Sequence, residues 1–176
     1  MWAYDGLPPA ELKDHPQGEV VEKAAAVQLH GGLQLDNGPR TVPRAGARFT
    51  TPRRIGGSFD YASFERRDYW AAHVTANTSE DPGELGTWGL GLARLSGQDE
   101  RWGGSLELAW DGFNNEPWGA HARYQAGVLT DKRFYHDLSA HVGFVKGRLG
   151  VSAGWRAWLT PVRNSTGPEL MLRVWL

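Results

Sequence analysis

The sequence contains no cysteine, only two methionines and almost no net charge. Without cysteine the chain can form no disulfide, no cysteine-ligated zinc site and no thiol nucleophile. Its 19 Lys and Arg residues are balanced by 20 Asp and Glu residues, which leaves a net charge of -1. A chain with this balance has no general electrostatic attraction for nucleic acid, so we expect no nucleic-acid partner.

Long apolar runs are also missing. No segment approaches the roughly 20 consecutive apolar residues of a membrane-spanning helix, which excludes an α-helical membrane protein. Met1 is followed by Trp2 and Ala3, without the basic and apolar regions of a signal peptide. Two interpretations fit this start: a cytoplasmic protein, or a mature form whose signal peptide was replaced by a start methionine.

Glycine and tryptophan, by contrast, are abundant, with 23 Gly and nine Trp in 176 residues. A compact helical protein has little use for so much glycine, so the composition favours an all-β fold. The length fits one domain. Because the first 22 residues are polar and interrupted by prolines, we predict an N-terminal appendage over residues 1–22 and a β domain over residues 23–176.

From residue 25 onward, polar and apolar residues alternate with a period of two, which is typical of strands. In residues 25–35, for example, Val27, Leu29 and Leu33 share one face, and His30 lies on the other. Pro43 and Pro52 lie at the two ends of the second segment, residues 45–52, and make it a less certain strand. The sequence predicts about ten strands, or eight if the early segments are not strands, at residues 25–35, 45–52, 57–66, 69–77, 87–96, 103–111, 119–129, 134–146, 148–159 and 169–176.

The contents of the two faces indicate which of them points inward. The polar face carries mainly Gly, Ser, His, Gln and Asn with isolated charges, and Lys132 and Lys146 both lie near turns. Small polar side chains suit the crowded lumen of a narrow barrel, which leaves the apolar face for lipid. Segments of about 9 to 13 residues also match tilted membrane-crossing strands. We therefore predict an all-β fold, an antiparallel up-and-down transmembrane β-barrel of about 8–10 strands.

Aromatic residues gather near the ends of the predicted strands. Amphipathic rings prefer the headgroup region of a bilayer, so this placement predicts two aromatic girdles. The residues concerned are Tyr69, Trp70, Trp88, Trp102, Trp110, Trp118, Tyr135 and Trp158.

Over residues 24–176 the chain resembles bacterial outer-membrane β-barrel proteins. The resemblance rests on the repeated hairpins and on the alternating terminal strand 170–176, in which Trp175 is penultimate and Leu176 is last. It implies a location in the bacterial outer membrane, with the lipid bilayer or lipopolysaccharide as partner. It also leaves open that residues 1–22 connect the barrel to a periplasmic partner or an export system.

The predicted inward faces of consecutive strands carry a cluster of charged and polar residues. Neighbouring strands lie about 4.8 Å apart, so these side chains are expected to meet across strands. The cluster is either a buried salt-bridge network that fills the lumen or a ligand-binding set. Its members are Glu107, Asp111, His121, Arg123, Asp137, Ser139, His141, Arg156 and Arg173.

Candidate catalytic and metal sites are weak. Asp137, Ser139 and His141 lie two residues apart on one strand, too far apart to hydrogen-bond in series as a catalytic triad. Residues 110–117 are faintly similar to a region of outer-membrane lipid A palmitoyltransferases, but Asp111-Gly112 stands where that family has Asp-Ser. The histidines have no metal-ligand spacing, and no cofactor motif is present, so we expect neither a metal nor a cofactor.

A basic cluster lies in the first third of the chain. Arg44, Arg48, Arg53 and Arg54 are expected either in a solvated loop or in contact with lipopolysaccharide phosphates, which match the geometry of arginine.

Three functions follow from this sequence. The leading hypothesis is a small outer-membrane barrel with a structural, anchoring or narrow transport role, or the barrel part of an export system. The first alternative is a soluble lipocalin-like barrel with an apolar ligand in an inward apolar cavity. The second alternative is an outer-membrane enzyme that modifies lipid or lipopolysaccharide.

Overall fold

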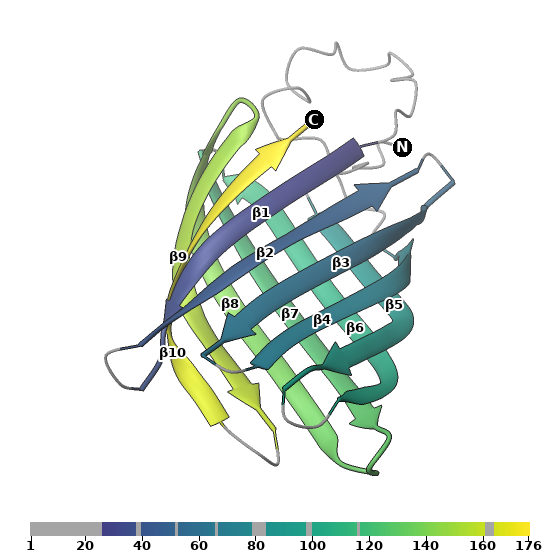
Figure 1. The fold of residues 1–176 in the computed structure, drawn as a ribbon. Coiled ribbons are helices and arrows are strands. Elements are labelled where there is room, and N and C mark those ends of the chain that lie inside the picture. The colour runs from purple at the N-terminus through teal and green to yellow at the C-terminus, as the bar shows by residue number, and fades with distance from the viewer. Residues whose placement is uncertain are drawn as a thin grey trace.

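Ten antiparallel strands close into a barrel in the computed structural model (Figure 1), which describes residues 26–37, 40–51, 53–65, 67–78, 84–97, 100–115, 117–160 and 164–176. Each strand pairs with the next along the chain, and β1 pairs with β10. The strands are β1 (Ala26–Leu35), β2 (Thr41–Thr50), β3 (Ile55–Phe64), β4 (Arg67–Asn77), β5 (Glu84–Leu95), β6 (Arg101–Asn115), β7 (Trp118–Leu129), β8 (Phe134–Lys146), β9 (Leu149–Leu159) and β10 (Asn164–Trp175).

This topology confirms the predicted all-β, up-and-down barrel and fixes the number of strands at ten. Within the described residues, no helix is long and apolar enough to cross a membrane. The predicted appendage, residues 1–22, lies outside the described part of the chain and stays a prediction.

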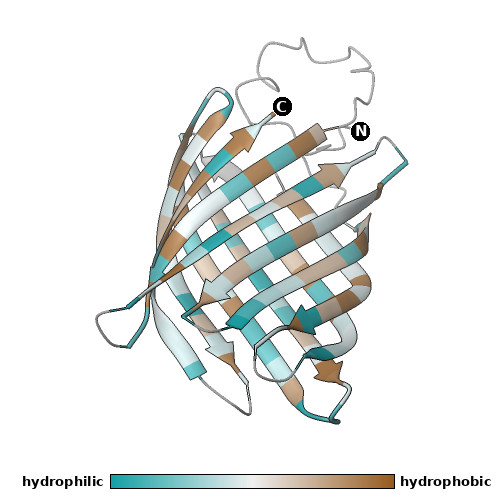
Figure 2. Cartoon of the chain, viewed as in Figure 1, coloured by the Kyte–Doolittle hydropathy of each residue, from teal (hydrophilic) through white to brown (hydrophobic). Residues whose placement is uncertain are grey.

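The outer wall of the barrel is apolar and its interior is polar. Exposed and buried residues alternate without a break along β8, where Leu138 and Val142 point outward and Asp137 and His141 point inward. Apolar and polar bands alternate along the other strands too (Figure 2). The lipocalin-like alternative required the apolar face to line the interior, and the structure has the opposite orientation.

β2 and β10 begin four and five residues before their predicted positions, because each runs through a proline. Pro43 of β2 pairs with Leu33 of β1, but pairing of β2 with β3 begins only at Arg44. Pro168 of β10 pairs with β9, and pairing of β10 with β1 begins only at Glu169. A proline has no N–H to donate, so it is tolerated where one side of its strand is unpaired.

The aromatic girdle prediction is wrong for three residues. Tyr69, Tyr135 and Trp158 point into the barrel and are buried, whereas Trp88 and Trp118, among others, are exposed on the outer wall. The buried rings belong to an apolar layer that we call the apolar plug. It consists of Val42, Ala62, Phe64, Tyr69, Ala71, Ala93, Leu95, Leu129, Tyr135 and Trp158.

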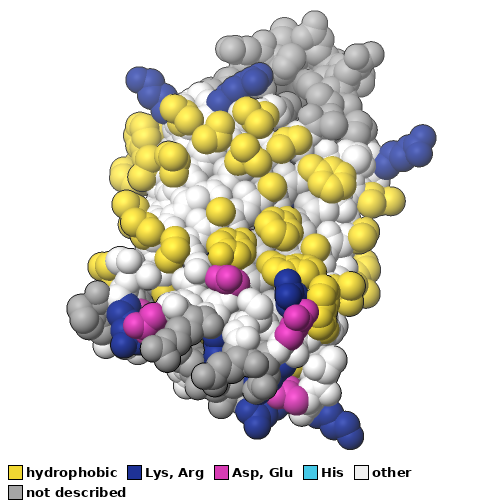
Figure 3. All heavy atoms as spheres, in the orientation of Figure 1, with side chains coloured by type: hydrophobic (Ala, Val, Ile, Leu, Met, Phe, Trp, Pro, Cys, Tyr) yellow, Lys and Arg dark blue, Asp and Glu magenta, His cyan; other side chains and the backbone are white. Residues whose placement is uncertain are grey.

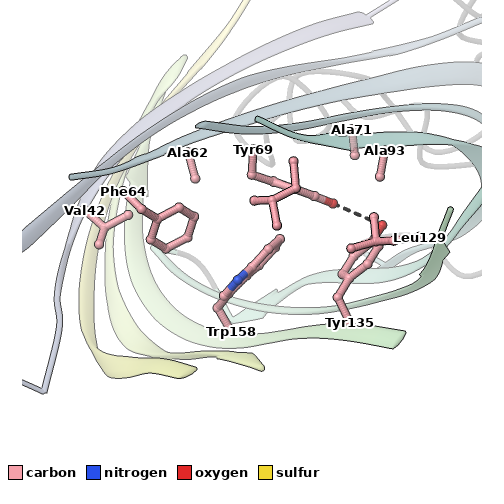
Figure 4. Packing of buried hydrophobic residues seen from close by; sticks show 10 residues of the cluster. Val42, Ala62, Phe64, Tyr69, Ala71, Ala93, Leu129, Tyr135 and Trp158 are labelled. Carbon is pink, nitrogen blue, oxygen red and sulfur yellow. Dashed lines mark hydrogen bonds between the residues drawn. The ribbon is translucent and has the colours of Figure 1, made fainter. Parts of the chain in front are cut away.

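The apolar plug lies at the end of the barrel opposite the start of β1 and the end of β10, which we call the termini of the barrel. Tyr69 and Tyr135 stand near the beginnings of β4 and β8, while Phe64 and Trp158 stand near the ends of β3 and β9. The ring of Trp158 packs with its centroid 4.2 Å from that of Tyr69 and 5.5 Å from those of Phe64 and Tyr135. Figure 4 shows these rings meeting across the interior. The plug therefore closes this end of the lumen with packed apolar side chains.

Inward glycines let neighbouring backbones and long side chains share the narrow interior, which yields a first prediction. A Cβ at Gly154 would overlap the carbonyl oxygen of Ala140 and lie 2.6 Å from the Cα of His141. We expect Gly154→Ala to lower the free energy of unfolding by about 1 to 3 kcal/mol, because backbone cannot move aside cheaply. The measurement is the denaturant midpoint of the protein folded in detergent.

The matched control is Gly104→Ala on the outward face of β6, where a Cβ would meet no heavy atom within 4 Å. This variant should unfold at the wild-type midpoint or slightly above it. Equal midpoints for the two variants would contradict the steric argument.

Candidate functional site: the lumen

The central lumen carries five carboxylates and five arginines among the described residues. Each of these side chains comes from the inward face of its strand and is largely or fully buried. We call this set the lumen network. Its members are Asp60, Glu107, Asp111, Asp137 and Glu169 with Arg44, Arg48, Arg123, Arg156 and Arg173. Equal numbers of the two charges cancel, as a narrow interior of low polarizability requires.

Arg123 links opposite sides of the barrel. Its guanidinium on β7 donates to both carboxylate oxygens of Asp60 on β3, and to Glu107 Oε2 at 3.0 Å from Nε and 2.6 Å from Nη2. Arg48 on β2 makes a second crossing, donating from Nη1 to Asp111 Oδ2 on β6 at 2.8 Å. β3 is not a neighbour of β7, and β2 is not a neighbour of β6. The Arg123–Asp60 and Arg48–Asp111 pairs therefore connect walls that no backbone hydrogen bond joins.

A second group of ion pairs lies along β8, β9, β10 and β2. Arg156 donates to both oxygens of Asp137, with Nε 2.7 Å from Oδ1, and its Nη1 lies 3.4 Å from Glu169 Oε1. Arg44 places Nε 3.4 Å from Glu169 Oε1 and donates from Nη2 to Gln34 Oε1 at 3.0 Å. Each group contains one bidentate arginine–carboxylate pair, Arg123 with Asp60 and Arg156 with Asp137, and such pairs are strong charged hydrogen bonds.

The predicted cluster residues all lie inside the barrel, and the structure pairs most of them. Glu107 binds Arg123, Asp137 binds Arg156, and Asp111 Oδ1 lies 2.5 Å from His121 Nδ1. The structure also shows partners that differ from a Ser–His–Asp series. His141 Nε2 lies 2.8 Å from Glu169 Oε2, and no hydrogen bond joins the described side chains of His141 and Ser139. That this cluster binds a ligand stays a prediction.

The expectation that four arginines share a basic loop is wrong for two of them. Arg44 and Arg48 belong to β2 and point into the lumen, where carboxylates hold them, so neither is placed to meet lipopolysaccharide. Arg53 and Arg54 do lie in the turn between β2 and β3. The predicted strand, residues 45–52, began after Pro43 and so left Arg44 outside it, and the inward face of Arg48 within it was not recognised. In β2 the alternation continues through Pro43 and puts both arginines on the inward face.

Several interior residues were missed by the sequence analysis. Asp60 and Glu169 complete the pairs of Arg123 and Arg156, and both share the inward face of their strands. His30 is another interior residue that was missed, and its Nε2 lies 3.1 Å from Asp60 Oδ1. The alternation of polar and apolar residues could have assigned these residues to the inward face. It could not have shown which charged residue of another strand each of them contacts.

One interior group places a serine, a histidine and a carboxylate next to one another, as in a catalytic triad. Ser105 Oγ lies 2.7 Å from His73 Nε2, and Glu107 Oε2 lies 3.6 Å from His73 Nδ1. However, Ser58 stands between His73 and Glu107, donating to Glu107 Oε2 at 3.1 Å, and Tyr135 donates to Ser105. Ser105 is thus engaged by the apolar plug, and this group ties that plug to the lumen network.

A small cavity lies on the other side of the network, toward the end that carries the chain termini. Its volume is about 40 Å³, and its wall includes Gln28, Arg48, Asp111, His121 and Arg173. This volume admits a few water molecules. Ser105 and His73 do not line it. In the described part of the chain, no group of three or more His, Asp or Glu residues is arranged to hold a metal ion.

No protein-family model matches the sequence, and no curated protein matches it. Several solved structures are similar in fold. The N-terminal β-barrel domain of Pseudomonas aeruginosa OprF covers 88% of this chain and 100% of its own, with 6% identity and a TM-score of 0.44. The KdgM porin, solved with disordered oligogalacturonate, covers 84% and 98%, with 8% identity and a TM-score of 0.46. Pseudomonas aeruginosa OccK11 (OpdR) covers 90% and 68%, with 12% identity and a TM-score of 0.34.

The lumen network predicts which arginines stabilise the barrel. Arg123→Ala leaves Asp60 and Glu107 buried without their main partner, so we expect the free energy of unfolding to fall by about 3 to 5 kcal/mol. Denaturant midpoints in detergent measure this loss.

The matched control is Arg40→Ala, which removes an exposed ion pair with Glu65 and should cost at most about 1 kcal/mol. An unchanged midpoint for Arg123→Ala would show that its charge is not needed for stability, and would favour a role in ligand binding.

Proposed function

We propose that this chain is a small outer-membrane β-barrel that spans the bilayer as a structural or anchoring element, with its lumen occluded. The observation that carries the proposal is the pairing of an apolar outer wall with a lumen closed by the apolar plug and the lumen network. The first feature suits a protein in lipid, and the second leaves no wide path for solutes.

The apolar wall supports the bilayer location. Val74 and Leu90, which pair across β4 and β5, are 69% and 58% exposed, and Leu106 continues this surface on β6. Figure 3 shows hydrophobic side chains spread over the middle of the barrel, with Lys and Arg toward its two ends. Monomeric proteins in water rarely expose a continuous apolar surface of this extent, whereas a bilayer covers it.

The rim opposite the termini combines aromatic and charged groups. Trp102 on β6 lies edge-on to Trp70, and the guanidinium of Arg94 lies 5.4 Å from its ring centre. Glu100, between β5 and β6, accepts hydrogen bonds from Arg94 Nε and Trp102 Nε1, and these bonds lower the pKa of its carboxyl group. Such amphipathic groups suit the boundary between acyl chains and headgroups.

The interior supports a closed barrel rather than a diffusion pore. From the end that holds the start of β1, a solute would meet the buried side chains of Leu85, Val145 and Trp175 and the small cavity. It would then meet the ion pairs of Arg123 and Arg156 across the lumen, and last the rings of the apolar plug. An eight- to ten-stranded barrel has little space beyond its own side chains. Wide passage would require both layers to rearrange.

Two finer roles belong to the same proposal. Arg53 and Arg54, in the turn between β2 and β3, have guanidinium groups of the kind that binds lipid phosphates. Residues 1–22 are the candidate connection to a periplasmic partner or an export system.

The bilayer location predicts a depth-dependent effect of arginine on the outer wall. Leu90→Arg, at the middle of β5, should impair folding into lipid by about 2 to 4 kcal/mol, because it places a charge near the midplane. Leu35→Arg, at the end of β1, is equally outward and should cost at most about 1 kcal/mol. The measurement is the free energy of folding into lipid vesicles. Wild-type protein that stays folded and monomeric in detergent-free buffer would refute the proposal.

The occluded lumen predicts negligible conductance. In planar bilayers the refolded protein should give no sustained ohmic steps, while a general porin in the same bilayers gives steps under the same voltage. Regular conductance steps from the wild-type barrel would contradict an occluded lumen and favour a narrow transport role.

A further inference from the structure

One arginine of the lumen network has no carboxylate partner in the described part of the chain. Arg44, Arg48, Arg123 and Arg156 each lie within 4.0 Å of a carboxylate oxygen. Arg173 on β10, only 8% exposed, has no carboxylate oxygen within that distance among the residues that the structure describes. Its guanidinium donates from Nη1 to Ser152 Oγ at 2.8 Å, which uses one of its five N–H groups.

The wall around Arg173 is rich in positive and hydrogen-donating groups. The cavity toward the chain termini is lined by four arginines, Arg48, Arg123, Arg156 and Arg173, and by three histidines. Asp111 is the single carboxylate that lines it among the described residues. That carboxylate is already engaged, by Arg48 Nη1 at 2.8 Å and by His121 Nδ1 at 2.5 Å. Among the described residues, Arg173 therefore presents N–H groups to the cavity for which the wall offers no free carboxylate.

A buried guanidinium that contacts no carboxylate is costly even where the charges of the surrounding network sum to zero, and an oxyanion is its natural complement. The planar fork of arginine binds the paired oxygens of a phosphate or carboxylate group through two parallel hydrogen bonds. The cavity volume of about 40 Å³ suits one such group together with little else. Gln28, near the beginning of β1, and Arg173, near the end of β10, place it toward the end of the barrel that carries the termini. It lies inside the wall, so the ligand must come from the aqueous phase on that side.

We propose that this cavity binds a small soluble oxyanion, a phosphate or carboxylate group, with Arg173 as its principal ligand. The site adds a binding function to a barrel that is otherwise closed. It does not depend on whether the barrel conducts, because the anion enters and leaves by the same end.

The test is a titration of the full-length protein, folded in zwitterionic detergent at low ionic strength. Inorganic phosphate and acetate are the two probes, and isothermal calorimetry and the thermal unfolding midpoint are the two readouts. Wild-type protein should bind at least one probe saturably, with a dissociation constant in the millimolar range or below, and its unfolding midpoint should rise with probe concentration. Binding of phosphate alone or of both probes identifies which oxyanions the site accepts.

Arg173→Gln should weaken that binding by roughly tenfold or more, because it removes the charged fork and leaves a shorter, neutral polar side chain. The control is Arg101→Gln at the opposite end of the barrel, where Arg101 Nε lies 3.2 Å from Asp131 Oδ2. Its affinity should stay within about twofold of the wild type, since distant sites act independently.

Absence of saturable binding of both probes by the wild-type protein would overturn the proposal, and this result needs no variant to fold. Equal affinities of the wild type and Arg173→Gln would overturn it as well. Neither result bears on the bilayer location, which the vesicle-folding experiment tests separately.

Discussion

The structure depends on the neutralisation of charge inside a narrow barrel. Ten strands leave an interior just wide enough for side chains, and each carboxylate or guanidinium placed there loses most of its hydration. Arg123 illustrates the solution, because it contacts Asp60 from the opposite wall and Glu107 from a neighbouring strand. Removing one partner would leave the others buried and uncompensated, so these residues act as a unit.

Inward glycines make room for these long side chains. At Gly46 on β2, a Cβ would overlap the ring of His30, which contacts Asp60. At Gly154 on β9, the space is taken by the backbone of β8. Small residues thus alternate with arginine and histidine around the lumen, and the abundance of glycine in the sequence follows from the small diameter of the barrel.

The two ends of the lumen differ in chemistry. Aromatic and aliphatic side chains fill the end opposite the termini, and Tyr69 joins them to the polar centre by donating to Gln125, which in turn donates to Glu107. The other end has only a small apolar cluster, Leu85, Val145 and Trp175, and near it a cavity with arginines in its wall. A barrel filled by apolar packing at one end, with Arg173 in a small cavity near the other, suits binding from one aqueous compartment better than passage between two.

The sequence by itself determined the class of fold and the face on which each strand residue lies, because a period of two is a local property of extended backbone. The same alternation places Tyr69 with His73, Tyr135 with Asp137 and Trp158 with Arg156 on inward faces; the girdle prediction failed because it relied on position along the strand. What the tertiary structure decided is the partner of each charge. Arg123 meets Asp60 across 63 residues only because the sheet closes with one register, and Pro43 is tolerated only because β2 lacks a partner on one side at that point. Closure and register are properties of all ten strands together, so no local pattern encodes them.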